Sequence, residues 1–152
     1  MVAYISMGFG NPYGDDWNVD IVVKWVDRLT ELGIKIIQLS DTIGVSNPGN
    51  ISYLFSQLIP HYEPMGVEIG AHLHTTPQKW EEKVHAAYLN GCRRFDGAIK
   101  GFGGCPMAKD ELTGNMPMEK VIQYLIENKI ETNLNLDAFS KSMDLSSEVF
   151  PH

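Results

Sequence analysis

Two histidines, His72 and His74, stand two residues apart at the end of the largely apolar segment VEIGAHLHTT (67–76). Side chains alternate between the two faces of a β-strand, so residues i and i+2 point the same way. Imidazole is a common ligand of divalent transition metals, and such a pair offers two adjacent coordination positions. The spacing fits a metal site, but it also fits two polar side chains that are hydrogen-bonded or solvated at the mouth of a strand.

Three further residues have side chains that can take part in chemistry near this pair. Asp41, in the segment LSDTIG, would either face the strand mouth with its carboxylate or cap the following turn. Cys105 stands in a glycine-rich segment, GFGGCPMAKDELTGN (101–115), where a thiol of lowered pKa can act as acid, base or nucleophile, or is incidental. Asn115 would be either the N-cap of the next helix or an oxygen ligand of a metal.

The candidate residues lie at or after the ends of predicted strands, and these strands alternate regularly with predicted helices. Apolar runs predict four strands, over 3–9, 35–41, 67–73 and 94–100. Apolar residues at helical spacing predict helices over 18–32, 48–60, 77–90 and 117–128, the third with Thr76 as N-cap before Pro77. The polar remainder, 130–152, is expected to hold only a short helix.

The strands recur about every 30 residues, which is the repeat of a βα unit. Such units form a parallel sheet covered by helices, so we predict an α/β fold. Two architectures fit, an open doubly wound sheet and part of a (β/α)8 TIM barrel; a full barrel needs about 250 residues, so four units make half of one. In both, ligands bind at the carboxyl ends of the strands, where Asp41, the histidine pair and the glycine-rich loop would form one site.

Composition narrows the class of protein. Hydrophobic residues make up 43% of the 152 residues and charged residues 20%, as in an ordinary globular domain. A net charge of −7 without a basic run argues against nucleic acid, and no apolar stretch approaches the roughly 20 residues of a membrane helix. Two cysteines and no secretory signal favour a reducing cytoplasm. The remaining histidines, His61, His85 and His152, are expected at the surface.

Three motifs together resemble one family. DTIGVSNPG (41–49), GAHLHTT (70–76) and the pair GFGGCPMA and TGN (within 101–115) are similar to the corresponding segments of 3-hydroxy-3-methylglutaryl-CoA lyases, in the DRE-TIM metallolyase superfamily. The likeness runs in unbroken order over about residues 3–128. The histidine pair and the Gly-Asn sequence mark the whole superfamily, whereas the GGCP loop is more specific for the lyase branch.

The resemblance implies a fold, a cofactor and a reaction. Residues 1–129 would supply strands five to eight of a TIM barrel, followed by a partly helical extension over 130–152. A divalent metal, Mg2+ or Mn2+, would be bound by His72, His74 and Asn115. The implied reaction is the carbon–carbon cleavage of an acyl-CoA or small hydroxy-acid substrate, with 3-hydroxy-3-methylglutaryl-CoA giving acetyl-CoA and acetoacetate.

The resemblance also implies roles for four other residues. Cys105 would be a mobile catalytic thiol that delivers or relays a proton to the acetyl-CoA enolate as its loop closes. Asp41 would lie beside the substrate and hold or exchange a proton. Thr42 and Asp96 are given supporting roles.

Two departures from the family pattern bear on the substrate and the metal. Thr75 and Thr76 stand where family members carry Asp or Asn after the second histidine, and the spacing from Cys105 to Asn115 is one residue longer. The family's fourth metal ligand, an aspartate beside an arginine on the first strand, falls outside the four units. Two other functions therefore stay open, a metal-dependent aldolase or acyl-CoA condensing enzyme and a non-catalytic half-barrel fragment.

A half-barrel has consequences of its own. Its first and last strands would expose unpaired backbone groups and the apolar side chains that fill a barrel interior. We therefore expect the chain to self-associate as a homo-oligomer or to be poorly soluble, and to lack lyase activity without the N-terminal half of the barrel.

Overall fold

The computed structural model describes residues 1–104 and 113–150. Four parallel strands form one sheet in the order β1-β2-β3-β5, and a two-stranded antiparallel ladder joins β4 to β6. The strands are β1 (Ala3–Ile5), β2 (Ile36–Ser40), β3 (Glu68–His72), β4 (His74–Thr75), β5 (Phe95–Asp96) and β6 (Gly114–Asn115). The helices are α1 (Val19–Glu31), α2 (Pro48–Tyr62), α3 (Trp80–Leu89), α4 (Met118–Glu127) and α5 (Leu136–Val149), with short 3-10 helices η1 (Glu63–Met65) and η2 (Ile99–Gly101).

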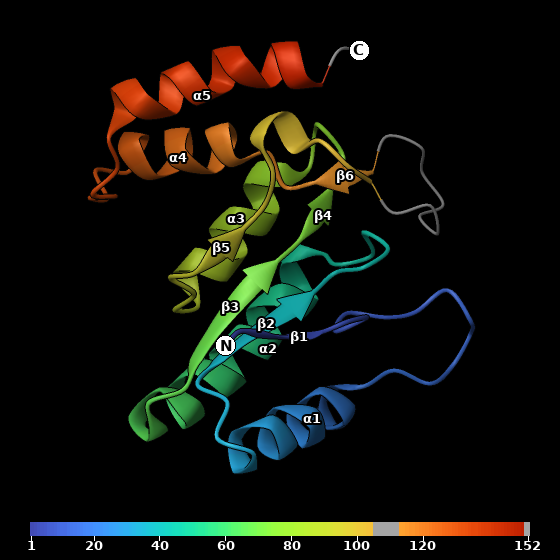
Figure 1. Cartoon of the computed structure of the whole chain (residues 1–152). Helices are drawn as coiled ribbons and strands as arrows, with labels where there is room; N and C mark the ends of the chain where they lie inside the picture. Colours follow the sequence, from blue (N-terminus) through green and yellow to red (C-terminus); the bar gives the residue numbers. More distant parts are fainter. Residues whose placement is uncertain (105–112, 151–152) are drawn as a thin grey trace.

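Consecutive strands are neighbours in the sheet, as short βα crossovers require. Ile37 of β2 pairs with Ala3 of β1 and with Ile69 of β3, and His72 of β3 pairs with Asp96 of β5. Figure 1 shows α1 at one end of the molecule and the pair α4 and α5 side by side at the other. The predicted α/β fold with a parallel sheet is confirmed.

The face of the sheet that packs on the helices is apolar. Ile37, Leu39, Ile69 and Ala71 alternate along β2 and β3 and are at most 3% exposed. They pack in one core with the buried face of α2, which consists of Ile51, Leu54, Phe55, Leu58 and Tyr62. Every second side chain of the strands thus packs on the apolar side of a helix. This burial is the main force that holds the strand–helix units together.

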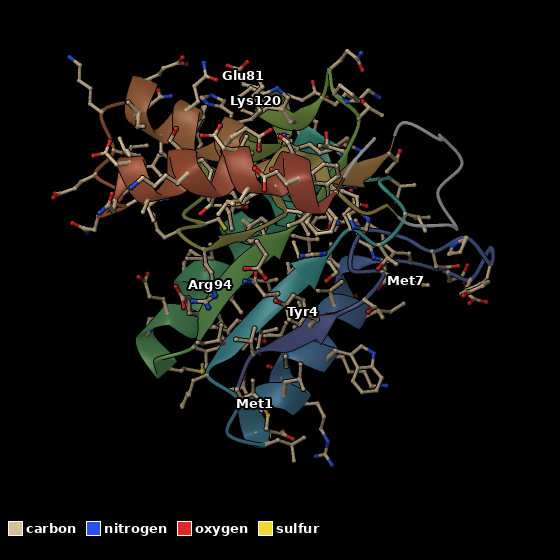
Figure 2. The ribbon with its side chains drawn as sticks, turned by 45° about the horizontal axis from the view of Figure 1, so that its top comes forward. Met1, Tyr4, Met7, Glu81, Arg94 and Lys120 are labelled. Atoms are coloured by element: carbon tan, nitrogen blue, oxygen red, sulfur yellow. The ribbon has the colours of Figure 1, made fainter. Side chains whose placement is uncertain are left out.

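The opposite face of the sheet is polar, and there the sequence-based expectation of an apolar interior is wrong. Tyr4, Gln38, His72 and Asp96 alternate with the core residues along their strands, and Arg94 lies two residues before Asp96; Figure 2 labels Tyr4 and Arg94. The Tyr4 hydroxyl and the Gln38 amide both donate to Asp96, whereas His72 Nδ1 has no hydrogen-bond partner among the described residues. A polar face of this kind can line a site rather than fill a core.

The helix starts differ in part from those expected. Asn47 caps α2 in a capping box with Asn50, which agrees with a helix beginning at Pro48. In contrast, α3 begins at Trp80, because residues 76–79 form a turn in which Lys79 N donates to Thr76 O. Thr76 is therefore not an N-cap.

The second half of the chain departs further from the predicted pattern. The strand expected over 94–100 is only Phe95–Asp96, and directly after it Gly97 approaches the Met116 carbonyl so closely that a Cβ there would lie 2.2 Å from it. The C-terminal region holds α5, a helix of 14 residues rather than a short one, and Asn135 caps it. No helix within residues 1–104 and 113–150 is long and apolar enough to cross a membrane.

Candidate metal site

The histidine pair lies where β3 passes into β4. His72 is the last residue of β3, and His74 opens β4, which pairs antiparallel with β6 so that His74 is opposite Asn115. Leu73 between them is 1% exposed, and its carbonyl accepts from Met116 N. The predicted common orientation of the two rings is supported by the distance between their centroids, 5.5 Å.

The His74 ring has a polar neighbour at each of its two nitrogens. Nδ1 lies 2.9 Å from the backbone carbonyl of Thr42, which can only accept, so Nδ1 carries the proton of this contact. Nε2 lies 3.2 Å from Oδ1 of Asn115. The Asn115 amide is oriented by its Nδ2, which donates to the carbonyls of Phe102 at 2.8 Å and Gly103 at 3.3 Å.

These contacts place two electron-pair donors opposite each other. A neutral imidazole protonated on Nδ1 has a lone pair on Nε2, and Asn115 Oδ1 is also an acceptor. Two facing acceptors at 3.2 Å repel unless a proton or a cation lies close to both. Adjacent ligands of an octahedral ion with bonds of about 2.1 Å lie about 3 Å apart, so both atoms fit one divalent ion.

His72 has the features of an additional ligand. It is half-buried, and its Nδ1 is a buried nitrogen without a hydrogen-bond partner among the described residues. Desolvation by burial lowers the pKa of His72, and neighbouring His74 lowers it further, although Asp96 acts in the opposite direction. The neutral form that this favours is the form that binds metals.

Asp96, predicted as a supporting residue, joins three strands on the polar face beside His72. It accepts from the Tyr4 hydroxyl at 2.5 Å and from Gln38 Nε2 at 2.9 Å. The hydrogen bond to Asp96 and partial burial raise the pKa of Tyr4. Tyr4 and Gln38 were missed at the sequence level, although their alternation with the apolar residues of their strands was a usable signal.

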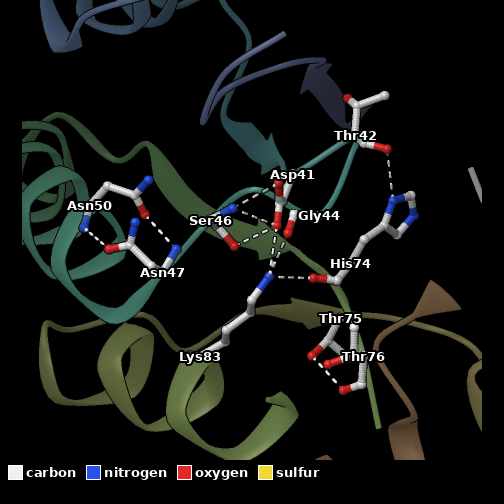
Figure 3. A network of polar contacts seen from close by, with 10 residues as sticks. All are labelled: Asp41, Thr42, Gly44, Ser46, Asn47, Asn50, His74, Thr75, Thr76 and Lys83. Carbon is white, nitrogen blue, oxygen red and sulfur yellow. Dashed lines mark hydrogen bonds and ion pairs between the residues drawn. The ribbon is translucent and has the colours of Figure 1, made fainter. Parts of the chain in front are cut away.

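Asp41 does not face the strand mouth; its carboxylate is buried in a polar network under His74, which Figure 3 shows. The backbone N of Ser46 donates to both carboxylate oxygens at 3.1 Å, and Ser46 Oγ donates to Oδ2 at 2.5 Å. Lys83 Nζ of α3 forms an ion pair with Oδ2 at 3.0 Å. These contacts favour the second interpretation of Asp41, in which its carboxylate caps the turn over residues 41–46.

Thr42, the other predicted supporting residue, links this turn to two elements of the site. Its carbonyl orients His74, and its Oγ1 accepts from Met7 N at 2.8 Å. Lys83 was missed at the sequence level. Its place in α3 between the apolar residues Trp80, Val84 and Ala87 was the available signal, because a lysine on that side of the helix needs a buried partner.

Cys105 lies outside the described residues, so its role stays a prediction. The residues on either side of this segment converge on the site, since Gly104 forms a bridge with Gly114 and Asn115 N donates to Gly103 O. Within residues 1–104 and 113–150, no three His, Cys, Asp or Glu side chains gather to hold a metal ion. The candidate set is therefore two imidazoles and one amide, without a carboxylate.

The other histidines behave as expected where they can be placed. His61 and His85 are exposed, and His152 lies outside the described residues. Cys92 is fully buried and its thiol donates to Arg94 O; burial raises the pKa of this thiol to about 12, so it is an inert core residue.

A parallel α/β sheet with polar groups gathered at the carboxyl ends of its strands defines the class, an α/β protein with its candidate site at the strand ends. A family model for HMGL-like proteins matches residues 3–145, and the chain belongs to this family. The resemblance inferred from the three motifs is thus confirmed.

Relatives and solved structures agree with this assignment. The chain is 33% identical to the hydroxymethylglutaryl-CoA lyase of Bacillus subtilis over 135 residues, 89% of this chain and 44% of that protein. It is 33% identical to that of Pseudomonas mevalonii over 139 residues, 91% of this chain and 45% of that protein. The structure of an HMG-CoA lyase from Acinetobacter baumannii in complex with coenzyme A and 3-methylmalate superposes with a TM-score of 0.85 at 30% identity, covering 99% of this chain and 48% of that one. The chain spans about half the length of these relatives.

Proposed function

We propose that this chain carries the metal-binding part of the active site of a divalent-metal-dependent lyase that cleaves a carbon–carbon bond of an acyl-CoA. The observation that carries the proposal is the pair of acceptors, His74 Nε2 and Asn115 Oδ1, that face each other at 3.2 Å. Family membership supports the reaction class, and 3-hydroxy-3-methylglutaryl-CoA is the proposed substrate.

The proposed ligands are His72, His74 and Asn115. One amide oxygen and two imidazoles form a mixed set with room for substrate oxygens, which favours Mn2+ or Mg2+ over a closed structural zinc site. When bound, such an ion would act as a Lewis acid on the hydroxyl and carboxylate oxygens of the substrate. The barrel strands that the chain would supply are strands five to eight.

The other residues have separate proposed tasks. The Thr42 carbonyl keeps the His74 ring oriented, and the Tyr4–Asp96 pair provides polar groups beside His72 for substrate oxygens. Cys105 donates the proton that the acetyl-CoA enolate needs. Asp41, given a catalytic role by resemblance, instead has the contacts of a residue that fixes the loop.

Metal binding is the direct test. We expect His74→Ala to weaken Mn2+ binding strongly in a spin-resonance titration of the free ion, because it removes one of the three proposed ligands. His61→Ala, at an exposed histidine on α2, is the matched control and should bind as the parent chain does. Equal affinity in the parent chain and in His74→Ala refutes the assignment.

The reaction is tested by acetyl-CoA formation from 3-hydroxy-3-methylglutaryl-CoA. Because the chain spans about half of its relatives, we expect turnover from the chain combined with the N-terminal half of the Bacillus subtilis enzyme, and little from the chain alone. Acetyl-CoA released without an added ketoacid distinguishes a lyase from a condensing enzyme. Light scattering of the chain alone tests the proposed homo-oligomer. The cytoplasmic location of the protein stays a prediction.

A further inference from the structure

Lys83 is a charged residue inside the molecule. It lies in α3 and is 1% exposed. Its Nζ donates to Asp41 Oδ2 at 3.0 Å and to the His74 carbonyl at 2.7 Å, and it lies 3.4 Å from the carbonyl of Gly44 (Figure 3). A buried ammonium group is costly unless its partners surround it, so Lys83 and its three acceptors restrain one another.

The acceptors belong to the two segments that determine where His74 lies. Two of them are in the loop 41–46, and the third is the backbone of His74 itself. The same loop carries the Thr42 carbonyl that accepts from Nδ1 at 2.9 Å. Lys83 therefore connects the backbone of this histidine to the loop that orients its ring.

We infer that Lys83 is a positioning residue for the metal ligand His74. By fixing the loop 41–46 against β4, Lys83 keeps the Thr42 carbonyl opposite Nδ1. The ring proton then stays on Nδ1, and the lone pair of Nε2 points toward Asn115. The inference rests on the proposed function, because this orientation matters when Nε2 binds an ion. Partners that orient a ligating histidine commonly change metal affinity by about 10–100-fold when they are removed.

The test separates orientation from folding. Lys83→Met alone leaves the Asp41 carboxylate buried without its cation and can fail to fold, so the informative variant is the uncharged double replacement Lys83→Met with Asp41→Asn. Lys79→Met, at an exposed lysine one turn earlier, is the control. Circular dichroism checks the fold, a spin-resonance titration gives the Mn2+ affinity, and long-range 1H–15N spectra of metal-free protein report which nitrogen of His74 carries the proton.

For the folded double variant we expect Mn2+ affinity to fall about 10-fold or more. We also expect the Nδ1–H signal of His74 to weaken in favour of the other tautomer, while Lys79→Met matches the parent chain. A double variant with the parent affinity and the parent tautomer overturns the inference. If the parent chain binds no Mn2+, the spectra alone decide: an unchanged Nδ1–H signal in the double variant overturns the positioning role, and a lost signal supports it.

Discussion

Replacing Asp41 with Asn removes the anionic half of a buried ion pair. The Lys83 Nζ to Asp41 Oδ2 distance is 3.0 Å, and the two side chains are 2% and 0% exposed. In Asp41→Asn the ammonium group of Lys83 stays buried without a counter-charge, and the new NH2 group faces either Ser46 N or Lys83 Nζ, both of which are donors. Removing one partner of a buried pair typically lowers the free energy of unfolding by about 3–5 kcal/mol.

The chain contains a matched pair at the surface. Arg28 and Glu31 are joined at the same distance, 3.0 Å, but their side chains are 64% and 65% exposed. Solvent screens an exposed pair, so Glu31→Gln should cost less than about 1 kcal/mol. The comparison holds distance constant and varies burial, which is the quantity that sets the cost of an unpaired charge.

Urea unfolding followed by tryptophan fluorescence measures both variants. With a denaturant slope of about 2 kcal/mol per molar, Asp41→Asn should lower the midpoint by about 1.5–2.5 M, and Glu31→Gln by less than about 0.5 M. Adding Lys83→Met to Asp41→Asn should recover part of the loss, because it removes the stranded charge. Similar midpoint changes for Asp41→Asn and Glu31→Gln would refute the reasoning.

Two further predictions concern a thiol and a glycine. In an active assembly, Cys105→Ser should lower turnover about 100-fold or more, the usual contribution of a positioned acid or base, whereas Cys92→Ser, in the core, should leave turnover intact; equal losses would contradict the catalytic role. Gly70→Ala should lower the free energy of unfolding by about 1–3 kcal/mol, because its Cβ would lie 2.2 Å from Oε1 of the buried Gln38. The urea midpoint measures this loss, and an unchanged midpoint would show that Gln38 moves aside freely.

The sheet and most helices followed from the sequence because their signals are local. The apolar spacing of α1 and the Asn47-Pro48 start of α2 act within a few residues. The parallel order follows from the short crossovers alone. The histidine pair was found in the same way, since spacing within one segment is enough to place two rings on one side.

The rest of the site depends on contacts between distant segments. The pairing of β4 with β6 brings Asn115 to His74 across 41 residues, and two-residue strands carry no periodic pattern. The burial of Lys83 is likewise decided by Asp41, 42 residues away. A polar side chain is expected at the surface until its partner is known, so the sequence left two alternatives open for the Asp41 carboxylate, facing the strand mouth or capping the turn.

The proposed ligands differ in how far the fold prepares them. His74 is restrained at its backbone by Lys83 and at Nδ1 by the Thr42 carbonyl, and Asn115 is restrained by the carbonyls that its amide donates to. The His72 ring, in contrast, packs edge-on against the Tyr4 ring, with 5.6 Å between the ring centroids. Its Nδ1 has no hydrogen-bond partner among the described residues. Restraint before binding lowers the entropy lost when an ion is bound. His74 and Asn115 should therefore form the fixed part of the site, and His72 the ligand that adjusts to the ion.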